Sequence, residues 1–421
     1  MKKTILICFL GTLSVIVQAN NFPELSCRIP GNWVFYGDEK GTVSVVLKNR
    51  TNQPVASQIH LDVTSDDYQP VYSFSQQTKI NTNDTVQATF TFNFPVPGFY
   101  RCRIYQEANG QKSEEKKFNI GYEPEKIISP KDAKPDFQSF WDDTRRELDR
   151  VKPEYQLTEL KKSSSKTRKV YQVKMKSFGG ETIEGYYVVP VKKGKYPVIV
   201  SYMGYGSKPW IPNPDNNPGF AEFVLSTRGQ GLLEPENKYG QWITYGLESK
   251  ETYYYRGAFM DLIRAIDFVA SRPEVDSEKI VAEGGSQGGA FTLAACALDR
   301  RIKAAAPFIP FLSDYKDYFK IVHWPRVDFE NYRKENPSAA WEQIYDVLSY
   351  FDIKNLASQI QCPIIMAVGL QDEVCPPHTN FAGYNQIKTE KQYYIFPEQG
   401  HDVPASWWEI RTTFYQKILE Q

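Results

Sequence analysis

A serine surrounded by glycines lies between a short apolar run and an alanine-rich run. Residues 284–288, Gly-Gly-Ser-Gln-Gly, fit the pattern G-x-S-x-G, in which a sharp strand-to-helix turn exposes the serine hydroxyl as a nucleophile. The runs at 279–283 and 290–299 predict a strand and a helix at the two places where that turn needs them. A phosphate loop or a plain connector is the alternative, but the Gly-Lys-Ser/Thr of a Walker loop is absent. The pattern therefore predicts acyl transfer through Ser286.

A serine hydroxyl is a weak nucleophile, so this chemistry needs a histidine base and a carboxylate that orients the base. The chain has four histidines, and His401 is the one that follows the last predicted strand. Asp372 comes just after the strand predicted at 363–369, with Glu373 as its closest rival. Where this motif occurs, the order along the chain is serine, acid, histidine. We therefore predict Ser286, Asp372 and His401 as the catalytic triad.

Acyl transfer also needs two hydrogen-bond donors for the developing oxyanion. One is the backbone amide of the residue after the nucleophile, here Gln287. The other is expected in the loop after an earlier strand, where Tyr205 lies between Gly204 and Gly206. Glycines at these places let the backbone approach a bound ester closely. We predict the amides of Tyr205 and Gln287 as the oxyanion hole, with a glycine turn of no catalytic duty as the alternative for Tyr205.

Strands and helices alternate along residues 122–421 and would position these groups. Strands are predicted at 170–176, 183–190, 196–203, 223–227, 279–283, 302–310, 363–369 and 392–397. Helices are predicted at 137–151, at 254–273, after Ser286 and from residue 406. Apolar strands that alternate with helices indicate an α/β domain with a mostly parallel, doubly wound sheet. A polar, aromatic-rich insertion occupies about 313–350.

Residues 20–121 have a different pattern, with short alternating strands separated by Asn, Gly, Pro and Asp turns. This pattern predicts an all-β, immunoglobulin-like sandwich of about 100 residues. Tyr100 lies two residues before Cys102, which is the spacing of a tyrosine corner. One disulfide, between Cys27 and Cys102, is allowed across the two sheets. The tryptophan spacing of antibody domains is not met, so we expect a sandwich of the general type.

The first residues predict a secretory signal peptide. Lys2 and Lys3 precede an apolar run at 5–17, and Ala19 ends a small-residue cleavage site. The run is shorter than the roughly 20 apolar residues that a spanning helix needs. An uncleaved anchor is the alternative. We expect a signal peptide at 1–19, a sandwich at 20–121, a catalytic domain at 122–421, and a periplasmic or extracellular protein with no membrane contact after cleavage.

Charge and cysteine content exclude several other classes. The formal net charge is zero, which gives no electrostatic reason to expect a nucleic-acid partner. The chain has six cysteines, and removal of Cys8 with the signal peptide leaves an odd number, which does not suit a disulfide framework. The sequence contains no CxxC pair and no Cys/His cluster, so no metal site is expected.

The second region is similar to the acetyl xylan esterase/cephalosporin C deacetylase family, carbohydrate esterase family seven. The similarity runs from about Lys134 to the C-terminus. The matching segments are 226–231 (STRGQG), 253–280, 284–289 (GGSQGG), 348–357 (LSYFDIKNLA), 368–387 (VGLQDEVCPPHTNFAGYNQI) and the Gly-His pair at 400–401. The three catalytic motifs keep their order and spacing, which makes the resemblance far more specific than G-x-S-x-G alone.

The resemblance implies an α/β-hydrolase fold and the removal of acetyl groups from sugar hydroxyls through an acyl-enzyme, without a cofactor. It places Ser286, Asp372 and His401 in the triad and the amides of Tyr205 and Gln287 in the oxyanion hole. An acetylated oligosaccharide or polysaccharide is the expected substrate. Single-domain members of the family form hexamers, so a homo-oligomer is left open, although the added sandwich could block that assembly.

This sequence departs from the family pattern at several positions. Asp402 follows the histidine where the family usually has Glu, and residues 207–214 replace further glycines after Tyr205. Glu283 is an unexpected carboxylate three residues before the serine, and burial without a partner would be costly. The segment Arg228-Gly229-Gln230 matches a family signature to which the resemblance gives a structural role.

Four tryptophans are expected in loops around the site, where they bind a sugar ring or pack. We predict Trp210 and Trp324 as substrate contacts; Trp242 and Trp407 are the other two. Two alternatives to an acetylesterase remain. One is a feruloyl or other ester hydrolase on the same fold, and the other is a glycan-binding protein with an inactive hydrolase domain. A prolyl-oligopeptidase-type peptidase is disfavoured because no region long enough for its propeller precedes the catalytic part.

Overall fold

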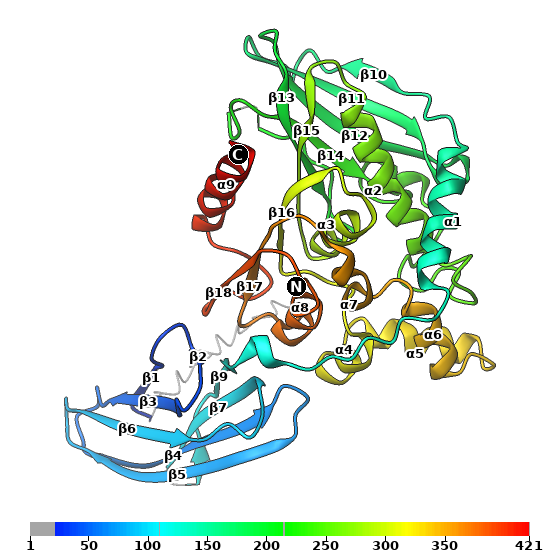
Figure 1. Ribbon diagram of the computed structural model, residues 1–421. Helices are drawn as coiled ribbons and strands as arrows, with labels where there is room; N and C mark the ends of the chain where they lie inside the picture. The colour runs from blue at the N-terminus through cyan, green and yellow to red at the C-terminus, as the bar shows by residue number, and fades with distance from the viewer. Residues whose placement is uncertain (1–21, 109, 214, 421) are drawn as a thin grey trace, which may run out of the picture.

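The computed structural model describes residues 22–108, 110–213 and 215–420 (Figure 1). The predicted signal peptide lies outside the described residues. An all-β region, drawn in blue and cyan, lies against a larger part in which helices flank a nine-stranded sheet. None of the helices in the described ranges is long and apolar enough to cross a membrane.

The all-β region consists of two sheets that share one core. The first sheet has the order β1 (Glu24–Arg28), β3 (Gly41–Lys48) and β6 (Thr85–Phe92). The second has the order β2 (Val34–Phe35), β9 (Lys116–Tyr122), β7 (Gly98–Ala108), β4 (Val55–Ser65) and β5 (Pro70–Ile80), with β8 (Gln111–Lys112) beside β7. Every second residue of β3 and β4 is buried, which is the pattern of strands with one face in a core. The core is therefore built as the alternation predicts.

Two details of this region were predicted from Tyr100 and the cysteines. Tyr100 donates its hydroxyl hydrogen to the carbonyl oxygen of Val96 at 2.5 Å, four residues upstream, as in a tyrosine corner. The disulfide between Cys27 and Cys102 is not formed, because both are free thiols. Cys102 is buried in a core filled by apolar side chains, so the packing holds the sheets together without a covalent link.

The larger sheet is mixed, with antiparallel strands at one edge and parallel strands through the rest. Its order is β10 (Gln156–Glu159), β11 (Arg168–Lys176), β12 (Thr182–Pro190), β14 (Ala221–Ser226), β13 (Tyr196–Tyr202), β15 (Val275–Gly285), β16 (Ile302–Phe308), β17 (Ile364–Gly369) and β18 (Lys391–Phe396). Neighbouring strands from β14 to β18 are parallel. All residues of β14 and β17 are buried, as expected when both faces of a parallel sheet are covered. This α/β-hydrolase arrangement confirms the predicted fold class. The antiparallel strands at one edge are the main feature that the prediction did not specify.

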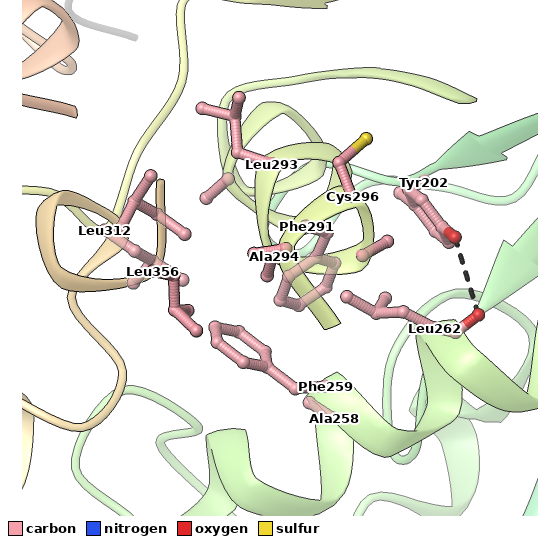
Figure 2. Packing of buried hydrophobic residues seen from close by; sticks show 14 of the residues in the cluster. Tyr202, Ala258, Phe259, Leu262, Phe291, Leu293, Ala294, Cys296, Leu312 and Leu356 are labelled. Carbon is pink, nitrogen blue, oxygen red and sulfur yellow. Dashed lines mark hydrogen bonds between the residues drawn. The ribbon is translucent and has the colours of Figure 1, made fainter. Parts of the chain in front are cut away.

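Helices cover the two faces of this sheet. On β13, Val198 and Val200 contribute to the core that contains α1 (Phe137–Asp149), α2 (Tyr254–Ala270) and α3 (Gln287–Leu298). Ile199, which points the other way, contributes to the core under α9 (Ser406–Leu419). Figure 2 shows the first core around α3, where Phe291 lies near Phe259 and the Tyr202 hydroxyl donates to the Leu262 carbonyl oxygen at 3.4 Å.

The remaining elements are short helices. The insertion after β16 folds into α4 (Tyr315–Ile321), α5 (Arg326–Glu335) and α6 (Trp341–Leu348), followed by α7 (Ile353–Leu356), with α8 (Pro377–Tyr384) after β17. The 3₁₀ turns are η1 (Pro124–Lys126), η2 (Phe178–Gly180), η3 (Gly231–Glu236) and η4 (Ala357–Gln359).

Residues 123–135, which join the two parts and are rich in proline and lysine, are bonded to the catalytic part. Ser129 donates to the Asp314 carboxylate at 2.5 Å, and Asn355 donates to the Asp132 carboxylate at 2.9 Å. Ile127 is buried in the larger core. The sandwich is therefore attached through a fixed segment.

Candidate active site

Ser286 lies on the sharp turn between β15 and α3. Its φ of 58° and ψ of −123° are strained for a residue with a side chain, which is the conformation of a nucleophile elbow. The turn is held by its backbone, because the Ser286 amide donates to the Phe308 carbonyl oxygen at 3.1 Å. The Ser286 carbonyl oxygen accepts from the amides of Ala290 at 3.1 Å and Phe311 at 3.0 Å.

The glycines around Ser286 are required by close packing. A Cβ atom on Gly288 would lie 2.1 Å from the carbonyl oxygen of Tyr202, and one on Gly285 would lie 2.0 Å from the Phe308 ring. A Cβ atom on Gly284 would lie 2.5 Å from the Gly288 carbonyl oxygen. The start of α3 therefore approaches β13 and β15 more closely than any side chain allows. This geometry distinguishes a nucleophile elbow from an ordinary glycine-rich connector.

Asp372 and His401 meet at the ends of neighbouring strands. Asp372 follows β17, His401 follows β18, and Nδ1 of the histidine lies 2.8 Å from Oδ2 of the aspartate. The other oxygen of Asp372 accepts from the amides of Val374 and Cys375, both at 2.8 Å. The Asp372 side chain is fully buried and that of His401 is 30 % exposed. Glu373, the rival acid, is exposed to solvent, so the carboxylate beside the histidine is that of Asp372.

Ser286 and His401 line the same cleft, which has a volume of about 970 Å³. The serine hydroxyl also faces a neighbour that sequence reasoning missed, because its Oγ lies 3.9 Å from the Sγ atom of Cys375. Burial raises the pKa of the Cys375 thiol well above its usual value, so this neighbour is an uncharged thiol. The sequence signal for this contact is the position of Cys375, which lies three residues after the predicted acid Asp372.

The two segments predicted to supply the oxyanion donors both lie next to the serine. Gln287 is the first residue of α3, so its amide has no partner within the helix and is free for a ligand. In the second segment, a Cβ atom on Gly204 would lie 3.9 Å from the Cβ of Ser286, which places the Tyr205 loop beside the proposed nucleophile. The structure therefore brings both predicted segments to Ser286.

Gln230 connects these two segments. Its side-chain oxygen accepts from the Gly206 amide at 3.1 Å and from Nε2 of Gln287, also at 3.1 Å. Two residues earlier, Arg228 forms a buried ion pair with Asp261, with Nη2 at 2.7 Å from Oδ1. The Arg-Gly-Gln segment is thus anchored at one end and holds the oxyanion segments together at the other.

Of the two tryptophans predicted as substrate contacts, only Trp210 lines the cleft. Trp210 is 42 % exposed and lines the cleft. Trp324 is not among the residues that line it, because its ring stacks on Phe311 at 5.4 Å between centroids. Trp242 and Trp407 are buried, at 8 % and 0 % exposure.

Trp408, which the sequence reading passed over, is 40 % exposed and lines the cleft. Its ring centroid lies 5.4 Å from that of Phe308, the residue whose backbone holds Ser286. Helical periodicity does not separate it from Trp407, because Trp407 packs with Ile410, Phe414 and Ile418, while Tyr415, seven residues after Trp408, is buried in the same cluster.

The carboxylate of Glu283 has partners. Ser201 donates to its Oε1 at 3.2 Å, and Nε of Arg411 on α9 lies 3.3 Å from its Oε2. Arg411 also donates from Nη1 to the Asn217 side chain at 3.0 Å. The partner that a buried carboxylate requires is thus supplied by the closing helix.

Comparison with known proteins decides the family. The family described as acetyl xylan esterase (AXE1) matches residues 122–418, well over half of the chain. The chain belongs to the acetyl xylan esterase family. The esterase is 27 % identical to the acetyl esterase Axe7A of Xylanibacter ruminicola, over all of this chain and 96 % of that protein. It is thus a carboxylic ester hydrolase of the acetylesterase type.

Solved structures of two acetyl xylan esterases resemble this esterase. The one from Paenibacillus sp. R4 is 33 % identical with a TM-score of 0.66, and the match covers 70 % of this chain and 98 % of that one. Acetyl xylan esterase 1 from Thermoanaerobacterium sp. JW/SL YS485 is 28 % identical with a TM-score of 0.65, covering 70 % of this chain and 97 % of that one.

Proposed function

We propose that this esterase removes acetyl groups from xylan-derived or other acetylated saccharides through a covalent acetyl-serine. The observation that carries the proposal is the 2.8 Å contact between His401 and Asp372 at a cleft that also contains the strained Ser286. Since Nδ1 of His401 faces the carboxylate, Nε2 is the atom left for proton transfer. A buried carboxylate in this place holds the imidazole in the required tautomer and stabilises its charged form.

In the first half-reaction, Oγ of Ser286 attacks the acetyl carbonyl carbon while its proton passes to Nε2 of His401. The amides of Tyr205 and Gln287 donate to the oxyanion of the tetrahedral intermediate. The bond between the acetyl carbon and the sugar oxygen then breaks, and the sugar oxygen takes the proton from His401. In the second half-reaction, water loses a proton to His401 and attacks the acetyl-serine, and acetate leaves as Ser286 recovers its proton.

A saccharide is favoured as the alcohol part of the substrate by the surface around the serine. Trp210 and Trp408 present exposed indole rings to the cleft. Aromatic rings combine a flat apolar face with a polar edge, which suits the faces of sugar rings. The cleft volume of about 970 Å³ is at the upper end of small-molecule sites and leaves room for more than one sugar ring.

The proposal is tested with purified mature protein and a panel of acetylated polysaccharides, acetylated oligosaccharides and feruloyl esters. We expect acetate release from the saccharides, little ferulate release, and loss of activity in Ser286→Ala. Mass spectrometry after rapid acid quench should find an additional acetyl group on the peptide that contains Ser286. Unchanged hydrolysis of a small acetyl ester by Ser286→Ala would exclude the mechanism.

Export is part of the same proposal, because a polysaccharide substrate is outside the cell. The support is the basic start, the apolar run and the small-residue site at Ala19. Expression of the full chain followed by N-terminal sequencing is expected to find a mature protein that begins at residue 20 in the periplasm or medium.

A further inference from the structure

The sandwich contacts the catalytic part at the residue next to the proposed catalytic acid. Figure 1 shows β9 beside the orange region that contains β17 and α8. The Asn119 amide on β9 donates to Oε1 of Gln371 at 2.6 Å, and Nε2 of Gln371 donates back to the Asn119 carbonyl oxygen at 3.2 Å. The Asn119 side chain donates to the Leu370 carbonyl oxygen at 3.0 Å. Three hydrogen bonds therefore join one residue of the sandwich to the two residues before Asp372.

This contact occupies a free strand edge. β9 pairs with β7 on one side, but on the other side β2 reaches only Gly121 and Tyr122. At Asn119 the outer edge would leave a backbone donor and acceptor unpaired, and such groups need a partner. The Gln371 side-chain amide supplies both, much as a neighbouring strand would.

The same glutamine also binds the segment that leads to the proposed base. Nε2 of Gln371 donates to the Pro397 carbonyl oxygen at 2.7 Å, and its backbone amide donates to the Gln399 carbonyl oxygen at 2.8 Å. Residues 397–400 connect β18 with His401. One side chain thus links the sandwich, the acid segment and the base segment.

Further contacts hold the chain that follows Asp372. Asp66 of the sandwich lies 2.7 Å from Nδ1 of His378, on the first turn of α8. The Phe99 ring packs against that of Phe381 on the same helix, with centroids 5.8 Å apart. The sandwich therefore contacts the catalytic part both before and after the acid.

We propose that the N-terminal sandwich is part of the catalytic apparatus and that Gln371, together with Asn119, is a positioning residue for the Asp372–His401 pair. The inference rests on the catalytic roles proposed above. The hydrogen bond between acid and base spans segments that belong to different strands, and their relative position depends on what joins them. Misplacement by about 1 Å can lower a rate by about 100-fold, so a shared anchor acts on turnover rather than on substrate binding.

The test compares hydrogen-bond deletions at two places on the same interface in the full-length mature protein. Gln371→Ala removes the shared anchor. The matched control is Tyr36→Phe, which removes the 3.0 Å hydrogen bond between the hydroxyls of Tyr36 and Tyr393 and leaves residues 370–375 and 397–401 untouched. Asn119→Ala tests the same anchor from the sandwich side, since it removes the bond to Leu370 alone.

For Gln371→Ala we expect kcat on a small acetyl ester to fall about tenfold with KM changed less than about twofold, because positioning is lost and the cleft is not. Asn119→Ala should show a smaller fall in kcat. Tyr36→Phe should keep the kcat of the parent protein. A thermal unfolding curve for each variant verifies that it remains folded at the assay temperature.

Hydrogen exchange gives a second measurement that does not depend on activity. The amides of Val374 and Cys375 bind Asp372, so they should exchange faster in Gln371→Ala and at the parent rate in Tyr36→Phe. Unchanged kcat together with unchanged exchange in Gln371→Ala overturns the inference, as does an equal loss of kcat in both variants. Activity that survives in Ser286→Ala would instead refute the proposed mechanism, and exchange would still decide whether the sandwich holds the acid segment.

Discussion

Arg411 on the closing helix forms an ion pair with Glu283, the carboxylate three residues before the proposed nucleophile. Both side chains are nearly buried, at 7 % and 11 % exposure. Removal of one partner from a buried pair leaves an uncompensated charge, whereas removal of both is much less harmful. We expect Arg411→Met to lower the free energy of unfolding by about 3 kcal/mol. The double variant Arg411→Met/Glu283→Gln should recover most of that loss in urea unfolding, and an additive loss would contradict pairing.

The backbone strain at Ser286 makes a prediction about stability. Ala cannot relieve a φ of 58°, but Gly adopts it without steric cost. Both Ser286→Ala and Ser286→Gly should be inactive. The Gly variant should nevertheless be more stable than the Ala variant by about 1 kcal/mol in chemical denaturation, since relieved strain exceeds the added chain entropy. Equal or lower stability of the Gly variant would show that the turn is not strained.

The sequence could predict much of the site because its groups lie at strand ends. Ser286, Asp372 and His401 each follow a predicted strand, and parallel strands bring their carboxyl ends to one edge of the sheet. That is why Ser286 and His401 line one cleft, with Asp372 bonded behind the histidine, although at least 85 residues separate Ser286 from the other two in the sequence. The antiparallel direction of β10, β11 and β12 could not be predicted in the same way, because the residue pattern of a strand does not show whether it runs parallel or antiparallel to its neighbours.

The features that the sequence could not predict depend on packing between distant segments. Trp407 and Trp408 are identical in type, and the register of α9 against β16 decides which is buried. Whether Cys27 and Cys102 form a bond is likewise decided by geometry and not by spacing. The Gln371–Asn119 contact depends on how two separately patterned regions dock, and neither pattern contains that information.

The exposed tryptophans at the cleft predict that their removal weakens activity on an acetylated oligosaccharide but not on a small acetyl ester. Trp408→Ala should raise KM for an acetylated oligosaccharide about fivefold, which corresponds to about 1 kcal/mol, because a stacking surface is lost. The kcat/KM for a small acetyl ester should be unchanged. Trp210→Ala should behave in the same way. Tyr68→Ala, which removes an exposed aromatic ring from the sandwich, is the control. It should leave both the KM for the oligosaccharide and the kcat/KM for the small ester unchanged. An equal effect on both substrates would place Trp408 outside the sugar site.

The contact between His378 and Asp66 predicts a pH-dependent contribution to stability. Burial lowers the pKa of His378, but the hydrogen bond to Asp66 and the charges of Asp66, Asp314 and Asp317 outweigh burial, so the pKa is raised above 6.5. A group whose pKa is raised in the folded state stabilises that state fully below its unfolded pKa, and the contribution is lost as pH rises through the folded pKa. We therefore expect the pair to stabilise the protein below about pH 6.5 and progressively less above it.

The measurement is the difference in unfolding free energy between the parent protein and His378→Gln across a pH series. The difference should be largest at the acid end, below about pH 6.5, and should shrink as pH rises, because the neutral imidazole no longer attracts the three carboxylates. Asp66→Asn is the matched variant from the sandwich side and should reduce the same pH dependence, since it removes the charge nearest to the ring. A difference that grows with pH would mean that His378 is held neutral in the folded protein, and that the Asp66 contact does not depend on charge.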